Sequence, residues 1–366
     1  MSLNKAPGLQ IGNLKASIPI VQGGMGVGIA LSSLSSTVAN EGGIGVIAAT
    51  GIGMLETDFD TNFKEANKRA LRREIKRARE LTTGIIGVNI LVACSDYHDL
   101  LQTAVDEGAD LVFLGAGLPL RIPTELSSDG SRNIIAKIVP IVSSARAAGV
   151  IFQYWEKHYN HVPAAVVVEG PLAGGHLGFK KEQITNTDYS LEKILPEVIT
   201  VIKRYEQSFD KSIPVIAAGG VYTGADIHRF LQLGAQAVQM ATRFVATHEC
   251  DASLEFKEAY VNCKKEDLVI IDSPVGLPGR AIQNGFLRQV SSGTRIPFKC
   301  PWKCLKTCDT RTAPYCIGAA LVNAKNGDIE RGFAFAGANA HRIDTIICVR
   351  ELIKTLLIEY EIAAST

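Results

Sequence analysis

The sequence predicts an α/β protein built around a (β/α)8 barrel, or TIM barrel, and three observations support this fold class. Eight short apolar runs alternate with helical segments before about residue 265, and such a barrel typically takes about 250 residues. The runs are nearly continuous in apolar residues, as expected for parallel strands covered on both faces. Distinctive glycines and polar residues also follow many different runs, and in a barrel the carboxyl ends of all strands meet at one face. An open, doubly wound sheet is the alternative architecture.

The first four strands are expected where short apolar runs end near glycine or polar residues. The segments between them have apolar residues at helical spacing, and residues 63–81 also carry many Lys, Arg and Glu residues, which is typical of a solvated amphipathic helix. The expected strands are 18–22, 43–49, 85–91 and 111–114, and the expected helices are 29–40, 63–81 and 97–107.

The last four strands follow the same pattern of apolar runs separated by helical segments. The expected strands are 135–142, 164–168, 213–217 and 237–240, and the expected helices are 144–158, 191–209, 224–233 and 254–263. We therefore assign residues 1–265 to the barrel.

Beyond the barrel the alternation stops. Residues 266–340 hold a cluster of four cysteines together with Pro274, Pro278, Pro297, Pro301 and Pro314. We interpret this segment as an appended cap. Residues 341–366 contain a last helix, expected at 344–360, that would return to the barrel exterior.

The composition is that of a globular protein, with 46% apolar and 20% charged residues. Because 38 Lys and Arg residues nearly balance 37 Asp and Glu residues, for a formal net charge of +1, nothing indicates a nucleic-acid partner. No apolar run approaches the roughly 20 residues that span a bilayer, and no signal-peptide pattern begins the chain. We expect a cytoplasmic protein without a membrane partner, and the sequence does not indicate its oligomeric state.

One stretch combines a strand end with groups suited to chemistry. The apolar run 164–168 continues through Glu169 to the paired glycines Gly174 and Gly175 and then to His176. Adjacent glycines let backbone N–H groups approach an anion, and histidine titrates near neutrality. The stretch therefore predicts a phosphate cradle beside an acid/base group. The structural alternative is a strand-to-helix turn with a surface histidine.

A second glycine pair follows the next strand. Gly219 and Gly220 end one run, and Ala241 and Thr242 end the following one. The last two strands of such barrels commonly build a phosphate site from backbone N–H groups, and Thr242 would add a hydroxyl donor. The glycines at 24–28 match a dinucleotide fingerprint only superficially, and we discount that match.

Five ordered motifs resemble the nitronate monooxygenase family, formerly called 2-nitropropane dioxygenase, which includes flavin-dependent enoyl-ACP reductases. The motifs are the segments 19–25, 87–89, 173–176, 217–221 and 240–244, and a sixth match is the turn 336–339. The resemblance covers about residues 18–250 and that turn. It implies a barrel that holds non-covalent FMN and acts on a small molecule.

The resemblance also implies roles for individual residues. The backbone at Gly24 and Met25 would face the flavin ring, Asn89 would hydrogen-bond the edge of the ring, and His176 would act as the base or position the substrate. The residues that would cradle the phosphate are Gly174, Gly175, Gly219, Gly220, Ala241 and Thr242. The structural alternatives are that His176 is a structural histidine and that Asn89 only holds a loop.

Lys137 and Glu169 complete the expected cofactor-binding set. Lys137 is counted among the residues at or beyond the strand ends, and its alternative role is to pair with a nearby carboxylate. Glu169 stands where the family usually has Gln, and Leu172 stands where it usually has Glu. A carboxylate near the flavin would disfavour the anionic reduced form. The segment 137–144 is more similar to the enoyl reductase branch.

The resemblance implies an FMN-dependent oxidoreductase, first of all a nitronate monooxygenase that oxidises alkyl nitronates with O₂. One alternative is an NAD(P)H-dependent flavin reductase acting on an enoyl thioester or a quinone. Another is a non-enzymatic redox sensor that binds flavin or a metal.

The four clustered cysteines leave two interpretations open. Cys300, Cys304, Cys308 and Cys316 have the spacing C-x3-C-x3-C-x7-C. On one helix the first three would share a face, and thiolates suit zinc or an iron–sulfur cluster. The spacing is not that of a common zinc ribbon, so free or buried thiols are the other interpretation. We assign no metal ligand from the sequence.

Overall fold

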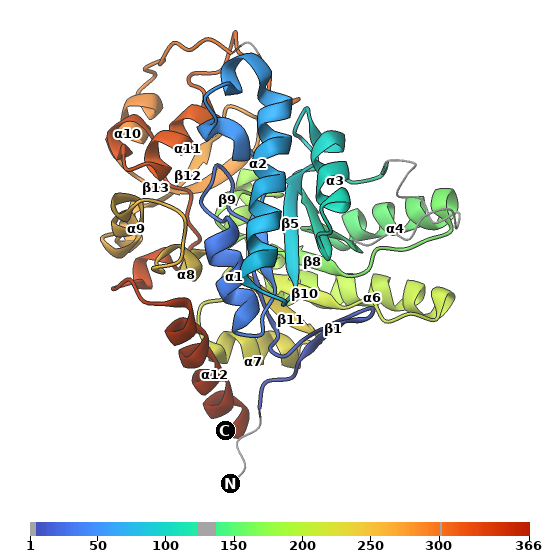
Figure 1. Cartoon of the computed structure of the whole chain (residues 1–366). Coiled ribbons are helices and arrows are strands. Elements are labelled where there is room, and N and C mark those ends of the chain that lie inside the picture. Colours follow the sequence, from blue (N-terminus) through green and yellow to red (C-terminus); the bar gives the residue numbers. More distant parts are fainter. Residues whose placement is uncertain (1–4, 123–136, 301) are drawn as a thin grey trace.

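The computed structural model describes residues 5–122, 137–300 and 302–366, and it shows a barrel of parallel strands surrounded by helices (Figure 1). The eight strands lie in the order β3-β11-β10-β8-β7-β6-β5-β4. The ring closes between β3 and the start of β4, because the Gln22 N–H donates to the Ile44 carbonyl at 2.9 Å and the Ile44 N–H donates to the Ile20 carbonyl at 3.0 Å. The predicted (β/α)8 fold class is confirmed.

The observed strands are close to those expected from the apolar runs. They are β3 (Ile20–Gln22), β4 (Gly45–Ala48), β5 (Ile86–Leu91), β6 (Leu111–Gly115), β7 (Lys137–Val142), β8 (Val166–Glu169), β10 (Val215–Ala218) and β11 (Ala237–Met240). Residues 135 and 136 of the expected fifth strand lie outside the described residues.

The helices cover the outer face of the barrel. They are α1 (Ser32–Asn40), α2 (Phe59–Leu81), α3 (Tyr97–Asp106), α4 (Ala145–Tyr159), α5 (Lys181–Ile184), α6 (Leu191–Phe209), α7 (Gly224–Gln232), α8 (Thr242–Val245) and α9 (Leu254–Val261). Helix α1 begins later than expected, and the Asp251 carboxylate accepts hydrogen bonds from the N–H groups of Leu31 and Leu34 at its start.

Side chains alternate between two cores along the barrel strands, as the strand period of two requires. On β8, Val167 packs inside the barrel, whereas Val166 and Val168 pack outward against the helices. On β11, Ala237 points inward and Val238 outward. This alternation fixes which strand-end residues face the mouth of the barrel.

A hairpin that the sequence analysis did not predict closes the amino end of the barrel. It consists of β1 (Leu9–Ile11) and β2 (Leu14–Ala16), paired antiparallel. Its buried residues Leu9, Ile11 and Ala16 belong to the barrel-interior core. The cap lies at the opposite end, at the top of Figure 1.

The cap joins the barrel through a small sheet. Strands β12 (Leu268–Asp272) and β13 (Pro278–Ile282) form a hairpin, and β13 pairs antiparallel with β9 (Gly175–His176), which follows barrel strand β8. Beyond it lie α10 (Gly285–Ser291) and α11 (Ile317–Lys325). The expected cap therefore shares a sheet with the loop that carries the predicted histidine.

The clustered cysteines Cys300, Cys304 and Cys308 do not lie on one helix. The described residues between α10 and α11 contain turns and an isolated bridge but no helix. Lys303 has a φ of 46°, and Pro297 and Pro314 lack the N–H that an inner helical turn needs. The cysteines therefore do not share a helical face.

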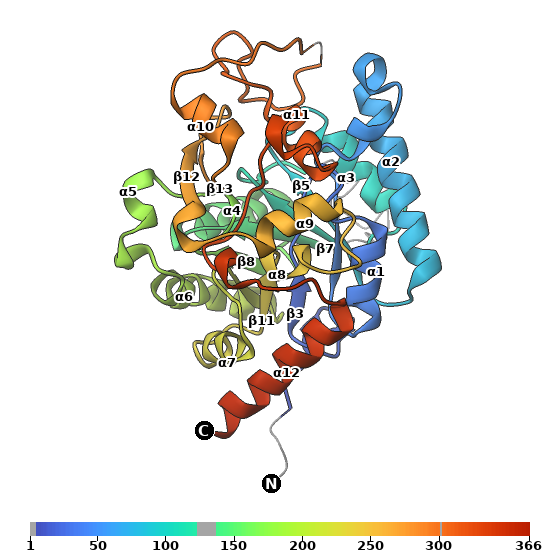
Figure 2. The same cartoon turned by 90° about the vertical axis from the view of Figure 1, so that its left-hand side faces the viewer.

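The last helix, α12 (Val349–Ser365), packs against α7 on the barrel exterior, as Figure 2 shows. The short 3₁₀ helices are η1 (Ile52–Leu55), η3 (Thr187–Tyr189), η4 (Lys265–Asp267), η5 (Ile329–Arg331) and η6 (Ala340–Arg342). In the described part of the chain, no helix is long and apolar enough to cross a membrane.

Candidate active site

Asn89 and Gly24 meet at the mouth of the barrel. Asn89 points inward from β5, and its side-chain N–H donates to the Phe113 carbonyl on β6 at 3.3 Å. A Cβ atom built on Gly24 would lie 2.4 Å from the Asn89 Cβ, so only glycine lets the loop after β3 pass this close. Met25 follows, partly buried, with its carbonyl accepting a hydrogen bond from the Ala30 N–H.

The predicted glycine loops after β8 and β10 touch each other. A Cβ on Gly219 would lie 2.7 Å from the Gly170 carbonyl oxygen, and one on Gly220 would lie 2.9 Å from the Leu172 Cβ. Gly175, with a φ of 79°, has no atom within 4 Å of its Cβ position. The loops are thus packed together on one side and open on the other.

The turn at 336–339 joins these loops to the end of β11. The Gly337 N–H donates to the Thr242 hydroxyl oxygen at 3.1 Å, and the Asn339 side-chain amide donates to the Gly220 carbonyl at 2.7 Å. A Cβ on Gly174 would lie 2.5 Å from backbone atoms of this turn. A Cβ atom built on Gly23 would lie 3.1 Å from the Ala241 Cβ, so Ala241 lies against Gly23. The predicted phosphate residues are therefore brought together.

His176 lies on β9 beside these loops and is held by the cap. Its Nε2 atom is 2.7 Å from the Ser273 hydroxyl in the β12–β13 turn, and its ring meets the Phe335 ring edge-on at 5.0 Å between centroids. Burial lowers the pKa of His176 from 6.5 to about 4, so the imidazole is neutral near pH 7. A neutral, oriented imidazole can accept a proton or hydrogen-bond a substrate.

Ser273 was not predicted as a site residue. It is 97 residues from His176 in the sequence, and no motif marks it. Its side chain is buried, and its hydroxyl oxygen also accepts from the Val275 N–H at 3.4 Å. Ser273 therefore positions the imidazole from the cap.

Arg280 is a second residue that the sequence analysis missed. Its buried guanidinium donates to the carbonyls of Pro171 and Ala173 at 2.7 and 2.6 Å. Burial lowers the pKa of Arg280 to about 10, so it stays charged at neutral pH. The arginine ties β13 to the loop that ends in Gly174.

Glu169 ends β8 at the inner rim of the barrel mouth. It has the same strand parity as Val167, which faces the barrel interior. Burial raises the pKa of Glu169 from 4.5 to about 7. Near neutrality a large share of this carboxyl is therefore protonated.

We expect the Glu169→Gln variant to be more heat-stable than the parent at pH 8. The pKa of Glu169 is raised in the folded state, so its stabilising contribution is complete below about pH 4.5 and is lost as the pH rises through about 7. Glutamine carries no such charge. Thermal unfolding in matched buffers should give a Tm gain on the order of 2–4 °C at pH 8, shrinking toward pH 5. An equal gain at both pH values would contradict this assignment.

Lys137 is not brought to the site. It is the first residue of β7, so it lies at the amino end of the barrel rather than the carboxyl end. Its side chain reaches the turn of the β1–β2 hairpin, where a Cβ on Gly12 would lie 2.8 Å from the Lys137 Cε. The expectation that it faces a cofactor is corrected accordingly.

Comparison with known proteins assigns the family. The model of the family described as nitronate monooxygenase matches residues 9–359. The chain belongs to the nitronate monooxygenase family. It is therefore an oxidoreductase of a flavin-dependent family, and the non-enzymatic alternative is set aside.

Three similar proteins are 23% to 29% identical to this chain. A probable nitronate monooxygenase from Staphylococcus aureus (strain Newman) is 29% identical over 304 residues, which cover 76% of this chain and 79% of that protein. The structure of FabK from Thermotoga maritima is 28% identical, covers 95% of this chain and 94% of that chain, and has a TM-score of 0.72. A nitroalkane oxidase from Streptomyces ansochromogenes, 23% identical with coverage of 96% and 97% and a TM-score of 0.71, shares the fold.

In the part of the chain that the structure describes, none of the four clustered cysteines forms a disulfide bond. Burial, followed by the charges of neighbouring cysteines, raises the pKa of Cys304 to about 12. Its backbone carbonyl accepts from the Ser95 N–H, beside Cys94 on the β5–α3 loop. Within residues 5–122, 137–300 and 302–366, no three side chains of the metal-binding types are arranged to hold one metal ion. A metal or cluster here stays a hypothesis that elemental analysis can decide.

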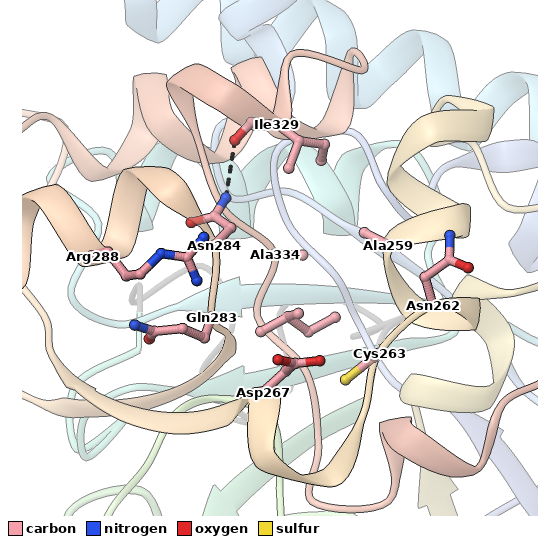
Figure 3. Close-up of a pocket in the computed structure, with 10 residues that line it drawn as sticks. Ala259, Asn262, Cys263, Asp267, Gln283, Asn284, Arg288, Ile329 and Ala334 are labelled. Atoms are coloured by element: carbon pink, nitrogen blue, oxygen red, sulfur yellow. Dashed lines mark hydrogen bonds between the residues drawn. The ribbon is translucent and has the colours of Figure 1, made fainter.

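A separate cavity of about 320 Å³ lies between α9, β13 and α10 (Figure 3). Gln283, Asn284 and Arg288 line one side, and Ala259 and Asn262 line the opposite side. The Asn284 amide is already bonded to the carbonyls of Ile329 and Gly332. None of the predicted site residues lines this cavity.

Proposed function

We propose that the chain is an FMN-dependent nitronate monooxygenase that oxidises alkyl nitronates with O₂. The observation that carries this proposal is the meeting of the glycine-containing loops after β8 and β10 with the turn at 336–339, beside His176 at the mouth of the barrel. A pair of such loops suits one phosphate group, because backbone N–H groups can approach the anion without obstruction. The family membership supports the redox chemistry.

The residues present fit FMN. Gly175 leaves open space where a side chain would otherwise stand. Thr242 accepts from Gly337 through its oxygen, which leaves its hydroxyl hydrogen to donate to a phosphate. Asn89 would meet the edge of the ring. When bound, the flavin would supply the electron transfer between the nitronate and O₂.

The protein's own contribution is placement and proton control. His176, neutral and fixed by Ser273, would hold a substrate oxygen or accept a proton at its imidazole. Arg280 would keep the 171–174 loop in the conformation that receives the phosphate.

The purified protein is expected to be yellow and to release FMN, not FAD, on denaturation. The glycine loops suit one phosphate, and no second adenosine-binding unit is evident in the sequence. Chromatography of the released flavin decides the point. FAD, or no flavin after attempts at reconstitution, would overturn the proposal.

Arg280→Met is expected to weaken FMN binding about tenfold, or roughly 1.4 kcal/mol. The change leaves the carbonyls of Pro171 and Ala173 without their charged donor, so the loop is free to shift. Fluorescence titration of the flavin-free protein measures the Kd. Arg288→Met on α10, which lines the separate cavity, is the matched control and should bind FMN normally.

The second candidate is an NAD(P)H-dependent flavin reductase acting on an enoyl thioester or a quinone. The similarity to FabK over 95% of this chain favours it. The segment 137–144, which is more similar to the enoyl reductase branch, favours it too. Anaerobic stopped-flow mixing separates the two functions. Rapid bleaching of the flavin by NAD(P)H supports the reductase, and bleaching by a nitronate alone supports the monooxygenase.

A further inference from the structure

Glu169 is the one carboxyl that the described strand ends point into the mouth of the barrel. The register places Ala218 of β10 beside it and Gln239 of β11 beyond Ala218, all with inward parity. On the other side, the inward residue of β7 nearest this level is Ile141, which pairs with Val167. Glu169 thus stands among uncharged neighbours on both sides.

Within the described residues, the Glu169 side chain has neither a hydrogen bond nor an ion pair. The charged and titratable groups of the adjoining elements are engaged elsewhere. Arg280 of β13 donates to the carbonyls of Pro171 and Ala173, and Lys137 lies at the far end of β7. His176 of β9 is bonded to Ser273. A negative charge on Glu169 is therefore not compensated by the protein, which agrees with its raised pKa.

We propose that Glu169 takes up a proton when flavin bound in the barrel mouth is reduced, an inference that rests on the proposed function. Two electrons from the substrate and one proton give reduced flavin with one negative charge. A second proton, from solvent, forms an O–H bond on the Glu169 carboxylate. Reduction then takes up two protons in place of one, and reoxidation by O₂ returns the second proton to solvent.

The physical reason is repulsion between two negative charges at the barrel mouth. Two negative charges that share this site cannot both persist at low energy, so the carboxyl with no partner becomes neutral. Glutamine at this position would never ionise. The residue at position 169 would therefore decide whether the protein adds to the pH dependence of the flavin's midpoint potential.

The test is the midpoint potential of the FMN-loaded protein between pH 5.5 and 9, measured for the parent and for Glu169→Gln. We expect equal potentials at pH 5.5, where the carboxyl is neutral in both redox states. At pH 9 the variant should have the higher potential, because its site lacks the negative charge. The parent's potential should fall more steeply with pH between these limits.

The control is Asp251→Asn. Burial raises the pKa of Asp251 to about 6, but its carboxylate accepts from backbone N–H groups at the start of α1, outside the barrel. The midpoint potential of this variant should change with pH as the parent's does. Glu169→Met, also uncharged, should follow Glu169→Gln. Two results would overturn the inference. One is the same midpoint potential at every pH for the parent and both Glu169 variants. The other is loss, in Asp251→Asn, of the parent's steep fall in potential with pH. Failure of the parent to bind flavin would instead refute the proposed function.

Discussion

Replacing His176 with alanine is expected to lower kcat/KM by roughly 10²–10⁴-fold, the range for loss of general acid/base help, while FMN stays bound. The imidazole is at the barrel mouth, but the phosphate would be held by backbone donors and Thr242, which the change leaves in place. Steady-state kinetics with a nitronate, together with the flavin content of the same sample, measure both parts of the expectation.

Two variants make this test specific. Ser273→Ala keeps the imidazole and removes only the hydroxyl bonded to Nε2, so it should lose less activity than His176→Ala. His228→Ala changes a histidine on the outer helix α7 and should be neutral. If His176→Ala has parental kcat/KM with the true substrate, the histidine has only a structural role.

The pH profile should also reflect the environment of the histidine. Because burial lowers the pKa of His176 to about 4, its protonation should reduce activity only on acidification toward that value and not near 6.5. A loss of activity centred near 6.5 that disappears in His176→Ala would contradict the buried, neutral state.

The barrel strands could be predicted because parallel strands covered on both faces are continuous apolar runs. The β1–β2 hairpin escaped because its strands have three residues each, too few for a pattern of alternation to stand out. Strand β9 has only two residues, and its pairing with β13 joins segments about a hundred positions apart. Such pairing depends on the folded barrel and leaves no local signal.

The same difference between local signals and contacts over long sequence distances explains which site residues could be predicted. The glycines after β8 and β10 could be identified because they follow strand ends, where loops must pass closely. Lys137 was wrongly expected at the site. It is the first residue of β7, and the first residue of a barrel strand lies at the amino end, away from the barrel mouth. Ser273 and Arg280 act on partners about a hundred residues away. They are visible only once the cap is seen to share a sheet with His176.

Gly174→Ala is expected to weaken FMN binding about 10- to 100-fold. The added Cβ would lie 2.5 Å from the carbonyl carbon of Ala336 and the N atom of Gly337. These are backbone atoms, which cannot rotate away as a flexible side chain can. Overpacking of this kind typically costs about 1–3 kcal/mol, and the strain falls on the contact between the Gly174 loop and the turn that bonds Thr242.

The matched control is Gly149→Ala, the same chemical change in helix α4. Its Cβ would meet only the Val201 Cγ1 atom at 3.9 Å, an ordinary van der Waals contact, and alanine favours a helix interior over glycine. Titration of flavin-free protein with FMN should therefore show weakened binding in Gly174→Ala alone, with both variants folded by circular dichroism. Parental affinity in a folded Gly174→Ala protein would mean that the loop and the 336–339 turn can separate without disturbing the cradle. The phosphate would then have to be assigned to the Gly219 and Gly220 loop without Gly174.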